Sequence, residues 1–306
     1  MKHRTKLLIL LLALLGAVAL FAAACGGDDD ATGKTPATTA PASPTKPAAT
    51  PFPADSTMAA IVKRGKLIVG TKYDQPGFGL KDPVSGKVDG FDVAIGKEIA
   101  KSLGLKEDQV EFVEAVSKNR IPYLQEDKVD IVIATFTINA ERKTQIEFSR
   151  PYYVAGQSIL VKKDNTSIKA AADLPGKKVC TAQGSTPEQT LKAKYPTAEL
   201  LLLDAYAGCV EAMKAGRVDA VSTDNVILLG FASTDATVKL VGGLFTSEPY
   251  GIGMKQGKKD MQAFVDSVLA RMFADGTYDK IYDQYLGKFE GMPKAKEARE
   301  SLPTTN

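Results

Sequence analysis

Polar side chains that could hold a small ligand gather where predicted strands give way to loops. Open α/β sheets build their ligand sites at the carboxyl ends of strands. Hydroxyl, cationic and anionic groups at these places are therefore candidates for binding. The candidate residues are Lys72, Tyr73, Arg120, Thr135, Thr137, Arg142, Thr186, Thr223 and Asp224.

Catalytic and metal-binding patterns are missing from the same sequence. The only histidine, His3, lies in a segment that we expect to be removed, which excludes His-dependent triads and histidine metal sites. Glu141 or Glu188 could act as an acid, but no carboxylate pair or nucleophile–base arrangement accompanies them. We expect no catalytic residue, no metal and no cofactor.

The elements that must position the candidates alternate between strands and helices. The first series is strand 66–71, helix 91–104, strand 110–115, helix 121–127 and strand 129–135. The second series is strand 177–182, a helix from Thr186, strand 200–203, helix 206–216 and strand 218–224. This alternation predicts an α/β fold of parallel βαβ units.

The two series resemble each other. LQEDKVDIVIATFT in the first matches AMKAGRVDAVSTDN in the second: a helix end, a basic residue, Val-Asp, an apolar strand and small polar residues. Two α/β lobes of related build would explain the match, and so would a βαβ unit that simply recurs. A further strand at 250–254 and amphipathic helices within 261–287 follow, and 289–306 is expected to be a polar tail.

The N-terminus has the layout of a secretory signal peptide. Lys2, Arg4 and Lys6 precede the apolar run 7–24. A transmembrane helix is the alternative, because 18 apolar residues could just span a bilayer. Cys25 favours the signal peptide, since its surroundings resemble a bacterial lipoprotein cleavage box, in which the cysteine is lipidated; Ala22 stands where such boxes usually have Leu. The chain after Cys25 lies outside the cytoplasm on either interpretation.

Residues 25–57 are rich in Ala, Thr and Pro and predict an extended tether that holds a domain away from a membrane. The full chain has 39 Lys and Arg against 36 Asp and Glu, but three of the cations lie in segment 1–24. The mature chain would therefore carry no net charge, and the basic surplus typical of nucleic-acid binding is missing.

Cys180 and Cys209 are the only other cysteines. In an oxidising compartment an isolated pair predicts a disulfide, which would contribute roughly 3–4 kcal/mol by closing a loop of about 30 residues. Two buried thiols are the alternative.

Seven stretches make the chain resemble the family 3 extracellular solute-binding proteins, the polar amino-acid receptors of ABC importers. They are GTKYDQPGFG (70–79), GFDVAIGKEIAKSLG (90–104), TINAERK (137–143), FSRPYYVAGQ (148–157), GSTPE (184–188), GRVDAVSTDN (216–225) and YGIG (250–253). The details are most similar to the glutamate-binding lipoproteins of high-G+C Gram-positive bacteria, which share KYDQPG, PYYVAGQ and both internal cysteines.

The resemblance implies a two-lobed periplasmic-binding-protein-like fold of type II, in which each lobe is a mainly parallel sheet flanked by helices. Lobe 1 would be discontinuous, at 58–151 and 253–288, and lobe 2 would span 158–247. Two hinge segments, 152–157 and 248–252, would join the lobes.

The resemblance also assigns roles to the ends of an amino-acid ligand. Arg142 matches the family arginine that grips the α-carboxylate in a two-pronged hydrogen bond. The backbone N–H groups of Thr137 and Thr186 would help, the latter at a helix N-terminus. Asp224 matches the family aspartate that pairs with the α-ammonium. Thr223 lies in the same motif, and Thr135 lies in the polar cluster that leads to Arg142.

Lys72 departs from glutamine-binding relatives, which carry an acidic residue at this position. A lysine favours a second carboxylate, so glutamate or aspartate is expected, while cationic amino acids would be repelled. Arg120 is a second candidate cation with a surface role as the alternative. Tyr73 would pack over the ligand or serve as an ordinary core aromatic.

These features predict a monomeric, lipid-anchored binding protein on the outer face of the cell membrane that delivers glutamate to an ABC permease. A glutamine or asparagine receptor is an alternative, as is a sensor that informs a membrane kinase. A lyase on the same fold is a remote alternative.

Overall fold

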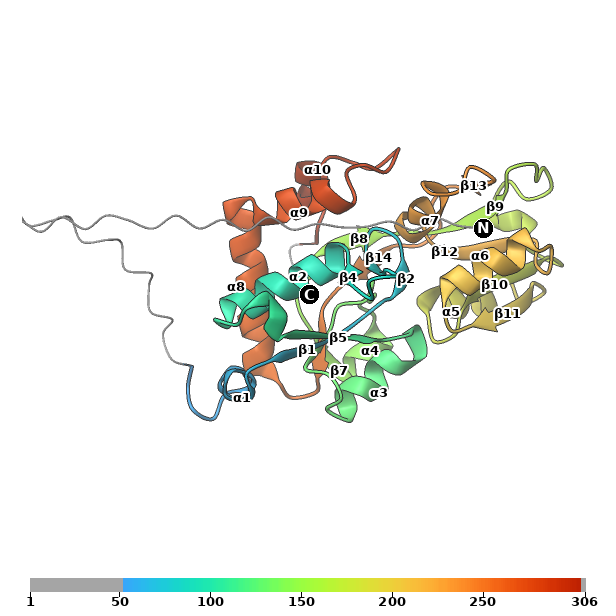
Figure 1. Cartoon of the computed structure of the whole chain (residues 1–306). Helices are drawn as coiled ribbons and strands as arrows, with labels where there is room; N and C mark the ends of the chain where they lie inside the picture. Colours follow the sequence, from blue (N-terminus) through green and yellow to red (C-terminus); the bar gives the residue numbers. More distant parts are fainter. Residues whose placement is uncertain (1–51, 304–306) are drawn as a thin grey trace, which may run out of the picture. The chain divides into compact units, whose positions relative to one another are not determined.

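The computed structural model describes residues 52–303 of the chain, and Figure 1 shows how their elements are arranged. The predicted signal segment, Cys25 and most of the predicted tether lie outside the described residues. No helix within 52–303 is long and apolar enough to cross a membrane.

Two five-stranded sheets carry the fold, in the orders β5-β1-β6-β15-β7 and β11-β10-β12-β9-β13. In each sheet the first three strands run parallel, and the fourth runs antiparallel to both of its neighbours. The two sheets therefore share one topology, in agreement with the two similar series in the sequence. The predicted α/β class is confirmed.

The first sheet is formed by β1 (Leu67–Thr71), β5 (Val110–Glu114), β6 (Ile131–Val132), β7 (Ile146–Phe148) and β15 (Gly253–Lys255). A separate three-stranded sheet consists of β2 (Asp74–Gln75), β3 (Gly79–Lys81) and β4 (Val88–Asp89). The accompanying helices are α1 (Thr57–Arg64), α2 (Phe91–Ser102), α3 (Arg120–Gln125), α4 (Ala140–Lys143), α8 (Lys259–Asp275), α9 (Thr277–Tyr285) and α10 (Ala295–Glu300).

The second sheet is formed by β9 (Gln157–Lys162), β10 (Lys178–Ala182), β11 (Glu199–Leu203), β12 (Ala220–Asp224) and β13 (Val238–Val241). Its helices are α5 (Thr186–Lys194), α6 (Tyr206–Lys214) and α7 (Asn225–Ala232). Cys180 on β10 and Cys209 on α6 are fully buried and form a disulfide, with their Cα atoms 5.3 Å apart. The predicted disulfide is thus present, and it fixes α6 to the sheet that it covers.

Two short strands carry the chain between the sheets. β8 (Tyr153–Ala155) precedes β9, and β14 (Glu248–Tyr250) precedes β15, which returns to the first sheet. β8 and β14 pair antiparallel, so that both passages lie side by side. The return explains how helices at the end of the chain come to pack near its beginning.

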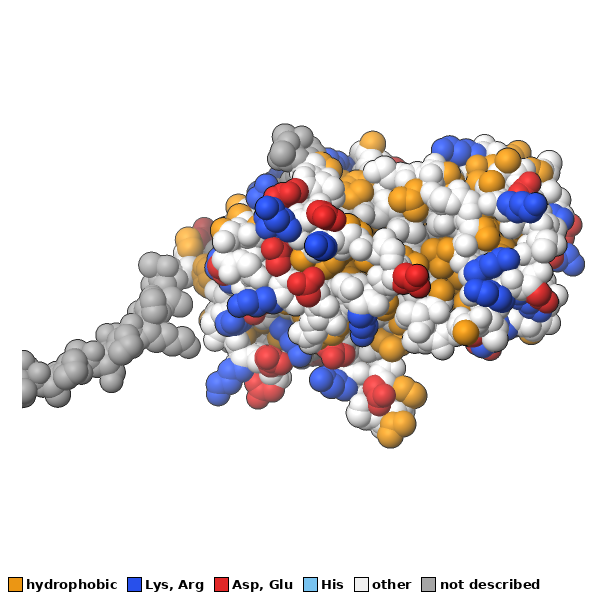
Figure 2. Space-filling view, turned by 90° about the horizontal axis from the view of Figure 1, so that it is seen from above, with side chains coloured by type: hydrophobic (Ala, Val, Ile, Leu, Met, Phe, Trp, Pro, Cys, Tyr) orange, Lys and Arg blue, Asp and Glu red, His pale blue; other side chains and the backbone are white. Residues whose placement is uncertain are grey.

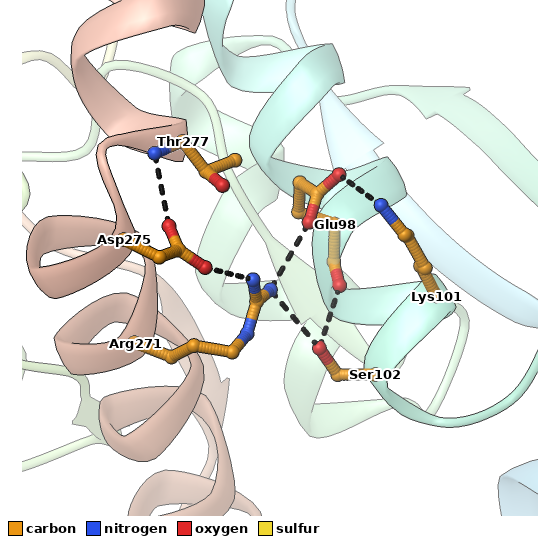
Figure 3. A network of polar contacts seen from close by, with 6 residues as sticks. All are labelled: Glu98, Lys101, Ser102, Arg271, Asp275 and Thr277. Atoms are coloured by element: carbon orange, nitrogen blue, oxygen red, sulfur yellow. Dashed lines mark hydrogen bonds and ion pairs between the residues drawn. The ribbon is translucent and has the colours of Figure 1, made fainter. Parts of the chain in front are cut away.

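The returning helix α8 is tied to α2 by charged side chains, which Figure 3 shows. The Arg271 guanidinium donates to the Glu98 carboxylate at 3.0 Å and to the Asp275 carboxylate at 2.9 Å. These groups are partly exposed, and such pairs contribute little individually, about 0–1 kcal/mol. Burial of Val265, Leu269 and Met272 along α8 provides the larger part of the attachment.

The structure differs from the sequence-based expectation in three places. The strand expected at 250–254 is interrupted, because β14 ends at Tyr250 and β15 begins at Gly253. The strand expected at 129–135 is regular only over Ile131–Val132, because Thr135 turns into the left-handed region at φ 45°. The tail expected at 289–306 contains α10, whose Ala295 and Ala298 are buried against the core, so that small apolar residues give it a packed face.

Charge on the surface is mixed. On the face that Figure 2 shows, Lys and Arg side chains are interspersed with Asp and Glu side chains. This agrees with the near-equal numbers of the two signs in the sequence. Such a face does not offer the basic field on which nucleic-acid binding depends.

Candidate functional site

Eight of the nine candidate ligand residues are buried, and strand ends and helix starts from both sheets position them. Their exposed fractions are all 9% or less, although every one is polar or charged. Buried polar groups need partners, so such a concentration is typical of a binding site. The eight are Lys72, Arg120, Thr135, Thr137, Arg142, Thr186, Thr223 and Asp224.

Arg142 reaches from the first sheet's side to the loop before α5. Asn139 caps α4 by accepting from the Arg142 backbone N–H at 2.8 Å. The Arg142 guanidinium then donates from Nη1 to the Thr137 carbonyl at 2.7 Å and from Nη2 to the Gly184 carbonyl at 3.3 Å. Burial lowers the pKa of Arg142 to about 10. A buried guanidinium in this position would gain from an anionic ligand.

The start of α5 lies beside the same arginine. Ser185 caps the helix, with its Oγ accepting from the Glu188 N–H at 3.2 Å, and Pro187 occupies the first turn. The Thr186 hydroxyl donates to the Thr137 hydroxyl at 3.3 Å. Thr137 follows β6 of the first sheet, and Thr186 begins α5, a helix of the second sheet. The candidate site is therefore assembled from both sheets.

Asp224 ends β12 and supplies a carboxylate. Its Oδ2 accepts from the Tyr250 hydroxyl at 2.5 Å, while its Oδ1 is buried without a hydrogen-bond partner in the described part of the chain. Burial raises the pKa of Asp224 to about 7, and the nearby charge of Glu248 adds to the rise. An ammonium group would satisfy Oδ1 and favour the ionised form.

Lys72 follows β1 and is 2% exposed. Its Nζ donates to the Ser117 hydroxyl at 2.8 Å, which leaves two of its three donors for another group. Burial lowers the pKa of Lys72 to about 7, and the positive charge of Arg120 adds to the fall. A carboxylate bound here would restore its positive charge.

Arg120 is buried among backbone carbonyls and the Phe136 ring. The alternative of a role on the surface is therefore excluded. Its Nε donates to the Ser117 carbonyl at 3.2 Å, and its Nη1 donates to the Ala134 carbonyl at 3.1 Å. Its guanidinium lies 4.2 Å from the ring centroid of Phe136, and that of Arg142 lies 5.0 Å from the same ring. Both buried cations therefore lie against the Phe136 ring.

Tyr73 is the one candidate that the structure does not bring into the buried cluster. Its hydroxyl donates to the Phe112 carbonyl on β5 at 2.6 Å, and Lys81 lies over its ring. Its side chain is therefore held against an edge strand of the first sheet.

Two buried residues escaped the sequence-based selection. Gln75 is fully buried; its Oε1 accepts from the Thr135 hydroxyl at 3.1 Å, and its Nε2 has no partner among the described residues. Glu248 is 4% exposed, and its Oε2 is likewise without a partner there. Both lie within or next to the family's motif stretches, but nothing in their spacing marks them as buried.

The buried charges of the cluster lack direct ion pairs. Within residues 52–303, none of them has an oppositely charged atom within 4.0 Å, although exposed charges form many such pairs. Unpaired buried charge is costly, so a fold retains it where a ligand supplies the partner. The charges concerned are those of Lys72, Arg120, Arg142, Asp224 and Glu248.

A cavity of about 470 Å³ opens beside this cluster. Ser117, Phe136 and Arg142 line one side, and Gly184, Glu188 and Gln189 line the other. The volume lies within the range of small-molecule sites. Of the five buried charged residues named above, Arg142 lines this cavity and the other four do not. The cavity therefore provides room for a small ligand next to the Arg142 guanidinium.

Comparison with known proteins places the chain in a family. Residues 67–288 match the model of the bacterial extracellular solute-binding proteins, family 3, and the chain belongs to this family. The "ABC transporter glutamine-binding protein GlnH" of Bacillus subtilis is 43% identical over 231 residues, which are 75% of this chain and 84% of that protein. The "Glutamate-binding protein GluB" of Corynebacterium glutamicum is 36% identical over 240 residues, 75% of this chain and 81% of that protein.

Solved structures support the same fold. An ancestral arginine-binding protein bound to glutamine matches with a TM-score of 0.69 and 45% identity, covering 74% of this chain and 99% of that one. The predicted two-lobed, periplasmic-binding-protein-like fold of type II is thereby confirmed.

Proposed function

We propose that this protein is the substrate-binding component of an ABC amino-acid importer, and that it holds one free amino acid between two lobes. The observation that carries the proposal is the set of buried charges of both signs that have no ion-pair partner among the described residues, one of which, Arg142, lines a cavity. An amino acid brings an anionic and a cationic group on one carbon and would pair both. The curated relatives, whose names specify glutamine or glutamate binding, support the same class of ligand.

The lobes in this proposal follow the two sheets. Lobe 1 consists of 58–151 and 253–288, lobe 2 of 158–247, and the hinges of 152–157 and 248–252. The antiparallel pair β8–β14 supports the placing of the hinges, because both passages of the chain run through it. Hinge motion would let a ligand enter before the lobes close.

Arg142 would bind the α-carboxylate and Asp224 the α-ammonium. For Arg142 the support is its burial next to the N-terminus of α5, where backbone N–H groups also favour an anion. For Asp224 it is the unpartnered, buried Oδ1. Thr137 would come from lobe 1 and Thr186 from lobe 2, and their backbone N–H groups would help to bind the carboxylate. Thr135 and Thr223 would line the same site.

We propose glutamate as the ligand. Lys72 has two donors to spare, and Gln75 presents an unpartnered Nε2, so the end of the ligand side chain would meet donors. A carboxylate fits this environment and would also pair with the Lys72 ammonium. Arg120, nearby, adds positive charge.

Glutamine is the second candidate. Its amide oxygen could accept from Lys72, and the Ser117 hydroxyl next to Lys72 could accept from its amide N–H. The 43% identity with a glutamine-binding protein favours this candidate too. The lowered pKa of Lys72 makes a neutral amine accessible near neutral pH, which suits an uncharged partner.

Proton uptake on binding separates the two ligands. With a pKa of about 7, Lys72 is mostly neutral at pH 8 in the ligand-free protein. A bound glutamate would raise this pKa, so calorimetry at pH 8 in buffers of different ionisation enthalpy should show uptake of close to one proton. Glutamine should give little uptake. Tight binding of glutamine together with weak binding of glutamate would overturn the choice of glutamate.

Membrane attachment through Cys25 and delivery to a permease complete the proposal. The family is extracellular by description, which supports a location outside the cytoplasm. Mass spectrometry of the protein extracted from its own membranes should show a diacylated Cys25 at the N-terminus. An unmodified N-terminus or an uncleaved leader would contradict the anchor.

A further inference from the structure

Glu248 is a buried acid that the assigned ligand contacts do not use. It begins β14, the second of the two strands that carry the chain between the sheets, and is 4% exposed. Its Oε2 is buried without a hydrogen-bond partner, and no Lys or Arg nitrogen of the described residues comes within 4.0 Å of its carboxylate. Another buried carboxylate, that of Glu147, does have such partners, since it accepts from Lys259 and Gln256.

The strand places Glu248 on the same side as the residue that contacts Asp224. Side chains two apart on a strand share a face, so Glu248 and Tyr250 point the same way, and both are buried while Pro249 between them is half-buried. The Tyr250 hydroxyl donates to Asp224 Oδ2 at 2.5 Å. The Glu248 carboxylate therefore starts about 7 Å along the strand from the tyrosine that fixes the Asp224 carboxylate.

The electrostatics agree with this placement. After burial, the charge of Glu248 is the main cause that raises the pKa of Asp224. Burial lowers the pKa of Arg142, and among the neighbouring charges that oppose this fall the charge of Glu248 has the largest effect. The charge of Glu248 therefore acts on both groups. Arg142 does not neutralise it directly, since its guanidinium hydrogen-bonds to the carbonyls of Thr137 and Gly184.

Two buried carboxylates that feel each other's charge repel unless a cation lies between them. Each here has one unpartnered oxygen, Asp224 Oδ1 and Glu248 Oε2, within the described part of the chain. An ammonium group carries three N–H donors on one compact cation and could donate to both oxygens at once.

We propose that Glu248 is a second ligand for the α-ammonium group, so that the ammonium is held between a lobe 2 carboxylate, Asp224, and a hinge carboxylate, Glu248. This inference rests on the proposed amino-acid function and extends it. Because Glu248 lies on a hinge strand, a ligand that contacts it also bridges lobe 2 and the hinge. Amino acids would then be selected over the corresponding dicarboxylic acids that lack the amino group.

The test uses the purified protein, stripped of ligand, and calorimetric titration with glutamate or glutamine, whichever binds more tightly. Glu248→Gln keeps the size of the side chain and removes its charge, and we expect it to weaken binding at least tenfold. Glu147→Gln is the matched control, since Glu147 is also a buried glutamate (6% exposed) but lies on β7, away from the cluster. It should bind within about twofold of the unchanged protein.

A double-mutant cycle separates contact with the ammonium from an indirect effect through Arg142. If both carboxylates hold one ammonium, the effects of Asp224→Asn and Glu248→Gln should be strongly coupled. The fold loss of affinity in the double variant should then be much smaller than the product of the two single losses. Competition by glutarate, the deaminated analogue of glutamate, provides the second readout. Glu248→Gln should weaken glutarate binding no more than twofold, or strengthen it.

Several results would overturn the inference. They are Glu248→Gln binding as tightly as Glu147→Gln, effects of Asp224→Asn and Glu248→Gln that simply multiply, or equal losses for glutarate and glutamate. Glu248→Asp guards against misfolding of the glutamine variant: it keeps the charge near Arg142 but withdraws the oxygens by one methylene, and it should also weaken glutamate at least tenfold. Failure of the unchanged protein to bind any amino acid would instead overturn the proposed function itself.

Discussion

Single buried charged residues in the cluster lower the stability of the ligand-free protein and, we infer, strengthen the binding of ligand. A lysine that is buried without an anionic partner costs free energy in the ligand-free protein, because its charged form is more stable in water. Lys72 has only the Ser117 hydroxyl as a partner among the described residues, and its pKa is lowered to about 7. We interpret such residues as groups that the fold keeps for the ligand.

Replacing Lys72 by Met should therefore stabilise the ligand-free protein while it abolishes tight glutamate binding. The folded-state pKa lies below the ordinary value of 10.5, so the cost of the lysine is fully present below pH 7 and disappears as the pH rises toward 10.5. We expect the free energy of unfolding to rise by about 2 kcal/mol or more at pH 6, since lowering a pKa by one corresponds to about 1.36 kcal/mol.

Denaturant unfolding from pH 6 to pH 10 would measure this gain, which should shrink as the pH rises. Lys163→Met, which replaces an exposed lysine, provides the control. A gain that does not depend on pH, or a loss of stability, would show that Lys72 is not a strained cation.

At the scale of elements, the disulfide joins a strand to the helix above it. Cys180 and Cys209 are 29 residues apart, and both are fully buried. Closing a loop of this length restricts the unfolded chain and contributes roughly 3–4 kcal/mol on the chain-entropy model. The double variant Cys180→Ser, Cys209→Ser should lose about that much stability in denaturant unfolding without reductant. A variant as stable as the unchanged protein would indicate that the bond is not formed in solution.

The sequence allows some elements to be predicted well. Apolar runs bounded by turn residues located β1, β10 and β12, and the Thr-Pro-Glu motif located the start of α5, because these signals are local. The shortness of β6 could not be predicted, since the strand ends at Val132, shortly before Thr135 adopts a left-handed conformation and the Arg120 guanidinium binds the Ala134 and Thr135 carbonyls. Those are tertiary effects.

The same reasoning explains the candidate site. Arg142 and Asp224 were selected because charged residues stand out in motifs of a known family. Gln75 and Glu248 were not selected, because their surroundings are formed by residues far away in the sequence: Gln75 meets the Thr135 hydroxyl, and the strand of Glu248 pairs with that of Ala155. Tyr73 was selected by its neighbourhood to Lys72, but alternate residues near a strand point to opposite sides.

At the scale of the whole molecule, close backbone contacts join the parts that we assign to the two lobes. A methyl group on Gly230 in α7 would come within 2.4 Å of the Pro76 carbonyl oxygen, and one on Gly184 would come within 2.6 Å of the Lys118 Cα. The Asp74 carboxylate also accepts from the Tyr206 N–H at the start of α6, at 2.7 Å. In the proposed lobe assignment these contacts join lobe 1 to lobe 2, and we infer that they form when the lobes close.

Gly230→Ala should hinder closure without harming the fold, because alanine favours a helix over glycine by about 1 kcal/mol. Small-angle scattering should show ligand-induced compaction in the unchanged protein, and the variant should bind more weakly and compact only at higher ligand concentration. Gly208→Ala in α6 is the control, since its methyl group would meet only the Leu203 side chain at 3.3 Å. Equal affinity and compaction in both variants would contradict a closing motion across this contact.

The most direct test of the central claim is calorimetric titration of the ligand-free protein with glutamate, aspartate, glutamine, asparagine and arginine. We predict tight binding of glutamate, weakened roughly 100-fold by Arg142→Lys, because lysine keeps the charge but loses the two-pronged hydrogen bond, worth about 1.5–3 kcal/mol per charged contact. Arg217→Lys, at an exposed position, should have no effect. Binding of none of the five amino acids, or glutamate binding that Arg142→Lys leaves unchanged, would contradict the account.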